Sequence, residues 1–444
     1  MHGMPDDCDC IWPVGKVPAL TMISRLNRMG YPGINRYFTV AIFSLPTIGG
    51  SAVSFLYNGG ALWALLDVMR GRTPLSREPH MLATAAALYL YCLAMGLSAL
   101  VNGDFIASLP KLAGLVSLLL FPFAYSNWRR SDKEEIMGAC LAGCAIASYG
   151  GLAFALVQAY AFAMPRPEGA AGNPLVFANV IAVAGGVALS GVFRRRGWLR
   201  LFFLGAFLAS ALAVSYSASR GPFLLVVAFA ILVTATHARG NRLQASVLGI
   251  LAALAILGLF VTSGITILES RMTVMFRELS MLVGQDNFST STGQRVALWQ
   301  IGTALWLEKP VFGHGAADLP LLINRHLQDE FGITLHFTHF HNVFLTTLVE
   351  GGVLGLAALL AMIAIPVIIA LRVLAQATLE VERFGATLLL IFFSMFLTSG
   401  MVNTVLRHDI MDAVFMAFLA AGLYLSAGTS LPEKPDAPPA ADPS

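Results

Sequence analysis

The chain has 444 residues, of which 57% are hydrophobic and only 12% are charged. A soluble domain carries about 25% charged residues, so this composition excludes a water-soluble fold of this length and predicts a membrane protein. The formal net charge of +3 is too small for a nucleic-acid-binding protein, which needs a concentrated basic face.

The first 36 residues are predicted to form a cytoplasmic N-terminal tail. Its opening, MHGMPDDCDC, is acidic and has no apolar stretch close behind a basic start, so it is not typical of a cleavable signal peptide. We therefore expect the first hydrophobic helix to act as an uncleaved signal anchor.

Twelve apolar runs are candidates for membrane-spanning helices, since a span needs about 20 mostly apolar residues. They lie at 37–54, 55–69, 81–101, 109–127, 135–163, 174–193, 199–216, 221–237, 244–263, 344–374, 384–402 and 409–427. The division of 37–69 is placed near Asn58, Gly59 and Gly60, and one long tilted helix there would give eleven. The predicted fold class is all-α, a polytopic transmembrane bundle of about 12 helices.

The positions of Lys and Arg predict the orientation, because basic residues gather in cytoplasmic loops. With a cytoplasmic N-terminus, the inner segments hold Arg25, Arg28, Arg36, Arg70, Arg72, Arg77, Arg129, Arg130, Lys133, Arg194, Arg195, Arg196, Arg200, Arg239, Arg242, Arg372 and Arg383. The short outer segments hold only Lys111, Arg166, Arg220 and Arg407. Both chain ends then lie in the cytoplasm, and the Pro- and Ala-rich tail 428–444 is expected to be disordered.

One connection, residues 264–343, is far longer than the others and lies on the predicted outer (periplasmic) side, between helices 1–9 (37–263) and helices 10–12 (344–427). A loop of more than about 15 residues in a compact protein is usually functional or disordered. Helical periodicity, for example in Val296, Trp299, Gln300 and Thr303, predicts short amphipathic helices that fold against the bundle.

A first cluster of polar residues, SYSASRGP, ends the run 199–216 and contains Arg220. A charge between two apolar helices is expensive, which favours a functional role. Gly221 and Pro222 suit a helix N-terminus, and an arginine beside free helix N–H groups forms an anion site best suited to phosphate. The alternative is an interfacial arginine that extends to lipid headgroups.

A second cluster, TGQRVALW, places Arg295 and Trp299 four residues apart and therefore on one helix face. The arginine could reach a ligand while the tryptophan packs against the bundle or the membrane interface. The segment EKPVFGHG follows it, from Glu308 to Gly315. The alternative is an ordinary amphipathic surface helix.

The third cluster holds His336, His339 and His341. Three histidines could ligate a metal, but no acidic or cysteine ligand lies close by, so we predict no metal site. His341 immediately precedes an apolar helix, for which Asn342 is a plausible N-cap. A histidine fixed at a membrane surface has a pKa near neutrality and can accept a proton from a hydroxyl.

A fourth, weaker feature is Lys111, which opens the run 109–127 on the predicted outer side and could contact a lipid phosphate. The alternative is a lysine that extends to the interface. Two arginines and a histidine on one face of a membrane bundle suit a phosphate-linked lipid donor, because the arginines would hold its head group and the histidine would activate an incoming hydroxyl.

These residues resemble the O-antigen ligase and polymerase superfamily of bacterial inner membranes. The resemblance is carried by Ser-Ala-Ser-Arg220-Gly, Arg295-x-x-x-Trp299, Pro310-Val-Phe-Gly313-His-Gly315 and His341-Asn342-x9-Gly352-x-x-Gly355. The last is similar to the His-Asn/Ser/Gln-x9-Gly-x-x-Gly signature of the family and is the most specific. Helix number, the large outer loop and topology agree as well, so the resemblance spans most of the chain.

The resemblance implies an O-antigen ligase of lipopolysaccharide biosynthesis in the bacterial inner membrane, with its active site facing the periplasm. Such inverting glycosyltransferases move a polysaccharide from undecaprenyl pyrophosphate to a sugar hydroxyl of the lipid A–core, without a metal, nucleotide or other cofactor. By motif position, His341 would be the general base or would orient the acceptor. Arg220 and Arg295 would bind the pyrophosphate and stabilise its charge. We expect His339, Trp299 and Lys111 to add to substrate binding, and we expect membrane lipids but no nucleic acid as partners.

Two relatives of this enzyme remain as alternatives, an O-antigen polymerase and a protein O-oligosaccharyltransferase, because they differ from the ligase only in the acceptor. A transporter or flippase is a different class of function. Transporters often carry ionisable residues at the bilayer midplane or inverted repeats, whereas here the polar residues gather at one surface and no repeat is evident.

Overall fold

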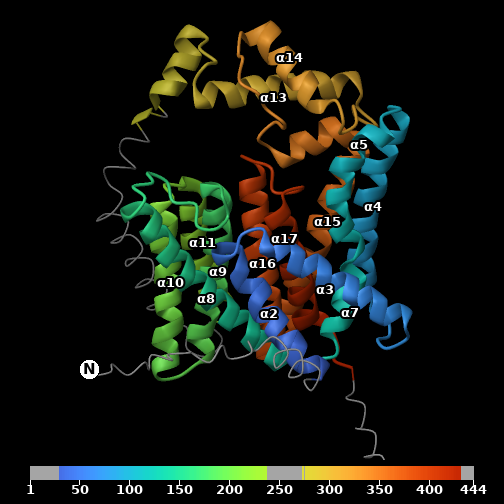
Figure 1. The fold of residues 1–444 in the computed structure, drawn as a ribbon, viewed down its shortest axis with the longest axis vertical. Coiled ribbons are helices and arrows are strands. Elements are labelled where there is room, and N and C mark those ends of the chain that lie inside the picture. Colours follow the sequence, from blue (N-terminus) through green and yellow to red (C-terminus); the bar gives the residue numbers. More distant parts are fainter. Residues whose placement is uncertain (1–29, 238–272, 275, 432–444) are drawn as a thin grey trace, which may run out of the picture.

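The computed structural model describes residues 30–237, 273, 274 and 276–431, and all regular secondary structure in these ranges is helical (Figure 1). Nine helical stretches among the described residues are long and apolar enough to cross a membrane. The all-α, multi-span class is therefore confirmed, while the predicted count of about 12 is not. The predicted span 244–263, the first 29 residues, the start of the long loop at 264–272 and the tail from 432 lie outside the described residues.

The helices follow one another along the chain with short connections, apart from the long segment before α15. Their bounds are α2 (Tyr31–Ile48), α3 (Ala52–Met69), α4 (Pro79–Val101), α5 (Phe105–Leu112), η1 (Ala113–Leu115), α6 (Val116–Leu119), α7 (Phe121–Trp128), α8 (Lys133–Tyr160), α9 (Pro174–Arg194), α10 (Trp198–Tyr216), α11 (Arg220–His237), α13 (Ser291–Glu308), α14 (Leu319–Phe331), α15 (Val343–Gln376), α16 (Glu380–Gly400) and α17 (Asp409–Ala427).

The division of 37–69 into two helices is confirmed, but its predicted position at 58–60 is wrong. The chain breaks at Gly49–Ser51, where Gly50 adopts φ +55°. A Cβ on Gly50 would lie 2.1 Å from the carbonyl oxygen of Ala170, so only glycine allows this contact. Asn58 instead stays helical, and its amide donates to the Ser54 carbonyl one turn earlier. The helix α2 also begins at Tyr31, six residues before the predicted start of the first span at 37.

The predicted helix 109–127 is an interrupted span, Phe105–Trp128, formed by α5, η1, α6 and α7 in succession. Pro110 lies inside α5, and Pro122 lies in the first turn of α7. Proline has no backbone N–H and clashes with the preceding turn, so each ring interrupts the helical hydrogen-bond ladder. The span is consequently a series of short helical segments.

The centre of the bundle is formed by α9 and α17, whose most apolar 18-residue windows are each 94% buried. The helix α16 packs against both of them. Small residues allow close approach here, since a Cβ on Gly185 would lie 2.5 Å from Ser210 of α10, and one on Gly422 would lie 2.7 Å from Leu389 of α16. Close packing through small residues replaces the hydrophobic effect as the main source of helix association in lipid.

The two ends of the bundle differ. The helices α13 and α14 lie across one end, at the top of Figure 1, and we call this the α13 end. They share a separate apolar cluster with the start of α15, made of Ala297, Leu298, Ile301, Leu305, Leu319, Ile323, Leu327, Ile333, Phe340 and Val349. The prediction of short helices that fold against the bundle is therefore confirmed for this part of the long loop.

Residues near the start and the end of the described chain both lie at the opposite end of the bundle. Arg130 lies over the ring of Tyr31, 3.0 Å from its centroid, and the Leu431 N–H donates to the Arg129 carbonyl over 2.7 Å. The backbone N–H of Thr429 also donates to Glu78 Oε1 over 2.9 Å. The beginning of the predicted disordered tail 428–444 is thus bound to the bundle, which corrects that prediction for residues 428–431.

Candidate functional site

The turn between α14 and α15 brings His339 and His341 face to edge, with ring centroids 4.6 Å apart. His341 adopts φ +49°, a left-handed backbone that is uncommon outside glycine and is found at functional sites. The Asn342 side chain accepts the N–H groups of Phe344 (2.9 Å) and Leu345 (3.0 Å), which confirms it as the N-cap of α15. The cap and the left-handed residue together determine where the His341 ring points. His336 is exposed.

A residue that the sequence did not single out, Asn403, contacts this turn. Its Oδ1 lies 3.3 Å from His341 Nδ1, although the two residues are 62 positions apart. Asn403 belongs to the connection 401–408 between α16 and α17. The pattern of the sequence contains no sign of this pairing, because it depends on how two distant connections meet at the α13 end.

Trp299 joins α13 to the histidine turn. Its indole N–H donates to the Phe340 carbonyl over 3.1 Å, and Phe340 itself is fully buried. The indole remains 37% exposed, so one part of the ring supports the turn and another part faces outward. The prediction that Trp299 packs towards the bundle is in accord with this contact, and its role in substrate binding stays a prediction.

Arg295 lies one helical turn before Trp299, on the exposed side of α13. Its positive charge lowers the pKa of His341. The Trp299 bond to the Phe340 carbonyl places the helix of Arg295 against the histidine turn. Within the part of the chain that the structure describes, the Arg295 guanidinium forms neither an ion pair nor a hydrogen bond. Its five N–H donors therefore remain available for an anion.

Burial lowers the pKa of both histidines, because a desolvated imidazolium is unfavourable. For His339 the pKa falls to about 4, with the neighbouring His341 and Arg407 adding to the effect and the Asn403 side chain opposing it. For His341 the pKa also falls, mainly through burial, while its hydrogen bond with the Asn403 side chain opposes the fall and the charge of Arg295 adds a smaller contribution to it. Both rings are therefore neutral at pH 7 and can accept a proton.

The remaining predicted site residues are Arg220 and Lys111. Arg220 is the first residue of α11, and its side chain lies outside what the structure describes. Lys111, on α5, donates its ammonium to the carbonyl of Ala316 and so holds the segment after α13 against α5. It is half-buried, and its contact with a lipid phosphate stays a prediction.

The Pro310–Gly315 segment is fastened to α15 at a kink. Gly352 interrupts α15 with φ +63° and ψ −162°. The N–H groups of His314 and Gly315 donate to the carbonyls of Val349 (2.8 Å) and Glu350 (3.0 Å) just before the kink. A Cβ on Gly352 would lie 2.1 Å from the Val311 carbonyl oxygen. The Pro310–Gly315 segment and the kink at Gly352 therefore form a single packed unit, although Gly315 and Gly352 are 37 positions apart.

A buried ion pair lies next to this kink of α15. The guanidinium of Arg407 donates to the carboxylate of Glu350, whose side chain is 3% exposed. Arg407 has φ +58°, and its N–H donates to Asp412 Oδ1 over 2.9 Å. Burial alone would lower the pKa of Arg407, but the adjacent Glu350 charge reverses this and raises it. Glu350 precedes Gly352 inside the histidine–glycine signature, so that motif was a signal for it, whereas nothing in the sequence marks its partner.

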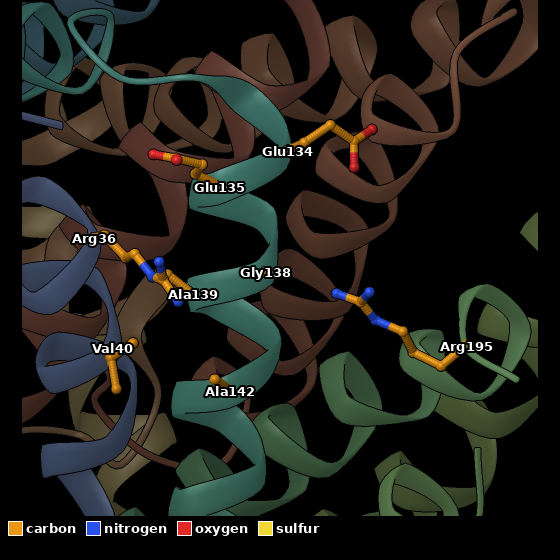
Figure 2. A pocket seen from close by; sticks show the side chains of 8 residues that line it. All are labelled: Arg36, Val40, Glu134, Glu135, Gly138, Ala139, Ala142 and Arg195. Carbon is orange, nitrogen blue, oxygen red and sulfur yellow. The ribbon is translucent and has the colours of Figure 1, made fainter. Parts of the chain in front are cut away.

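A cavity of about 450 Å³ lies away from the histidine turn, between α2, α8 and the α9–α10 connection (Figure 2). In Figure 2, Arg36 and Arg195 lie on either side of α8, with Glu134 and Glu135 nearer the start of that helix. This cavity shares no residue with the cluster of Arg295, His339, His341 and Asn403.

Part of the chain matches a known protein family. Residues 205–360 match the sequence model of the O-antigen ligase family. The matched range contains Arg220, Arg295, Trp299, His339 and His341, while Lys111, Asn403 and Arg407 lie outside it.

A curated relative, an uncharacterized protein of Haemophilus influenzae, is 26% identical over 117 residues. This match spans 26% of the present chain and 29% of the relative. The family match supports a relationship of this chain to the O-antigen ligase superfamily over the range that contains the histidine turn and Arg295.

Proposed function

We propose that this protein is an O-antigen ligase, an inverting glycosyltransferase that moves a polysaccharide from undecaprenyl pyrophosphate to a sugar hydroxyl of the lipid A–core. The observation that carries the proposal is the contact of α13 with the histidine turn, where the Trp299 indole N–H donates to the Phe340 carbonyl over 3.1 Å. This contact brings the helix that carries Arg295 to His341 at one end of a multi-span bundle, within the segment that matches the family. An exposed guanidinium on the helix that contacts a turn with a neutral imidazole suits a reaction between a diphosphate donor and a hydroxyl acceptor.

Arg295 binds the diphosphate of the donor in this proposal. Its planar fork matches two phosphate oxygens at once, which a lysine cannot do. A preorganised donor that stabilises charge as the leaving group departs is worth about 3–4 kcal/mol. Arg220 would supply a second guanidinium from the start of α11.

His341 accepts the proton of the acceptor hydroxyl. The hydroxyl oxygen forms a bond to the anomeric carbon of the donor sugar on the face opposite the diphosphate. The bond between that carbon and the diphosphate oxygen breaks, and undecaprenyl pyrophosphate leaves with the electron pair. Attack from the opposite face inverts the anomeric configuration. No metal or nucleotide is assigned to the step, because diphosphate is already a good leaving group.

The proposed orientation places the α13 end in the periplasm and the protein in the bacterial inner membrane. The clustering of basic residues in the segments of the opposite end supports this orientation. Single cysteines at exposed Arg325 of α14 and exposed Arg77 of the opposite end would test it in whole cells. We expect a membrane-impermeant thiol reagent to label the first position only, and the reverse pattern would reject the orientation.

Reconstitution of the pure protein in liposomes tests the activity. The donor is a lipid-pyrophosphate glycan, and the acceptors offered in separate reactions are lipid A–core, a second donor molecule and a Ser/Thr peptide. We expect glycan on lipid A–core, and full activity after chelation of metals. Longer lipid-linked glycan would identify a polymerase instead, and a glycosylated peptide would identify a protein O-oligosaccharyltransferase. Failure with all three acceptors would reject a glycosyltransferase.

A further inference from the structure

The connection 401–408 faces the histidine turn through a single polar side chain. Asn403 is half-buried and places its Oδ1 3.3 Å from His341 Nδ1. The nearest polar neighbours on the connection point elsewhere, since the Thr404 hydroxyl donates to the Leu406 carbonyl over 3.0 Å and the Arg407 guanidinium pairs with Glu350. Asn403 is therefore the residue through which α16 and α17 reach the proposed base.

We propose that Asn403 is a positioning residue that holds His341 as its Nδ1–H tautomer and directs Nε2 towards the acceptor hydroxyl. This inference rests on the proposed function, in which His341 is the base.

The chemistry of the contact determines the tautomer. An amide oxygen carries no hydrogen, so it can only accept, and the ring nitrogen that faces it must carry the proton. A neutral imidazole has one N–H and one lone pair. With Nδ1 protonated against Asn403, the lone pair lies on Nε2, which is the nitrogen able to take a proton from a hydroxyl.

Contacts to α15 position both Asn403 and His341. His341 immediately precedes α15, where the Asn342 cap fixes the first turn. Eight residues after this cap, Glu350 of the same helix binds Arg407, four residues after Asn403. The Arg407 N–H also bonds Asp412 Oδ1 in the first turn of α17 over 2.9 Å. The two partners are thus attached to the same helix, His341 through the chain and the connection 401–408 through its ion pair with Glu350.

A neutral partner also suits the charges around the ring. His341 faces Arg295 from α13 and His339 from its own turn, and Arg407 acts on His339 from the connection 401–408. Burial and the charge of Arg295 both lower the pKa of His341, so the imidazole is neutral at pH 7, which is the form a base requires. A carboxylate at position 403 would stabilise the imidazolium instead and would remove the base from its active form at low pH.

The first test is the pH dependence of transfer in the reconstituted system. Asn403→Asp keeps the shape of the side chain and adds a charge, so we expect the acid limb of the rate profile to move up by about one pH unit. Asn403→Ala removes a hydrogen bond that raises the pKa of His341, so we expect the acid limb to move down and the rate at pH 7 to fall about tenfold or more. Thr398→Ala is the matched control, because this exposed hydroxyl donates to the Ser394 and Met395 carbonyls of its own helix, α16.

A purely structural role would lower the rate of both Asn403 variants without moving the acid limb in opposite directions. That result would overturn the proposal. Asn403→Asp keeps the test decisive if Asn403→Ala does not fold, because the acid is nearly isosteric with the amide.

The second test does not depend on activity. In protein labelled with ¹⁵N-histidine, the shifts of the two ring nitrogens report the tautomer, and the His341 signals are those lost in His341→Asn. We expect Nδ1–H in the wild type and a mixture or Nε2–H in Asn403→Ala. An unchanged tautomer would overturn the positioning role, even where glycan transfer is observed. The expected tautomers together with no transfer to any acceptor would reject the proposed function alone.

Discussion

The carboxylate of Glu350 and the guanidinium of Arg407 form an ion pair between residues 57 positions apart, with side chains that are 3% and 17% exposed. Glu350 lies just before the kink of α15, and its carbonyl also accepts the Ser98 hydroxyl of α4 over 2.6 Å. The pair therefore connects α15, which begins at the histidine turn, with the connection that carries Asn403. A charge pair at this depth is costly to separate, because either partner alone would be a buried, uncompensated ion.

We predict that Glu350→Leu destabilises the protein by about 3–5 kcal/mol, since it leaves Arg407 buried without its partner. The double variant Glu350→Leu with Arg407→Met should recover a large part of this loss, because replacement of both ions by apolar groups is often neutral. Thermal or denaturant unfolding in detergent measures both. Equal destabilisation by the single and double variants would show that the loss does not come from the unpaired Arg407.

Gly352→Ala should prevent the normal docking of the Pro310–Gly315 segment. The backbone of Gly352 has φ +63°, and the added methyl would lie 2.1 Å from the Val311 carbonyl oxygen. We expect loss of folded protein in fluorescence-detected size-exclusion chromatography. The control is Gly59→Ala, a position in α3 with no other atom within 4 Å of the new methyl, which should behave as the wild type. Normal folding of Gly352→Ala would mean that the kink is not required.

Replacement of His341 should reduce glycan transfer about 10²–10⁴-fold, the usual contribution of a general base. His341→Asn is the sharper variant, because asparagine tolerates the left-handed backbone that His341 adopts. His326→Asn is the matched control, since the imidazole of this α14 histidine bonds Glu330 in the next turn of the same helix. Transfer rates in liposomes check both, and wild-type activity of His341→Asn would remove His341 from the mechanism.

Arg295→Ala should lower the transfer rate about 10²–10³-fold through loss of a charge-stabilising donor. Arg295→Lys should recover only part of it, because an ammonium cannot bind two phosphate oxygens as a fork. The matched control is Arg325→Ala, an exposed α14 arginine whose partner is Asp329 one turn away.

The residual activity of Arg295→Ala should also show a changed pH dependence. The base form of His341 is neutral, so activity is lost as the pH falls through its lowered pKa. Arg295 is one cause of that lowering, and its removal raises the pKa. The acid limb should therefore move to higher pH in Arg295→Ala. An acid limb at the wild-type pH would show that Arg295 lies too far from His341 to change its pKa.

Much of the fold could be predicted from the sequence because lipid imposes a strong rule. A span must be a run of apolar residues whose backbone bonds are satisfied internally, so α4, α8, α9, α10, α15, α16 and α17 lie close to their predicted ranges. The rule does not locate breaks inside apolar sequence. Asn58–Gly60 resembled a turn but is helical, whereas Gly50 breaks the chain through a contact with distant Ala170.

The sequence by itself determined the membrane class, the end-capping role of Asn342 and the nature of the candidate groups, since these depend on composition and local spacing. Only the tertiary structure decided that Arg295 acts on His341, that Asn403 faces its Nδ1, and that Glu350 pairs with Arg407. Each of these contacts joins connections that are tens of residues apart. Contacts of this kind arise from the packing of whole helices, and local patterns of residues carry no record of which helix ends will meet.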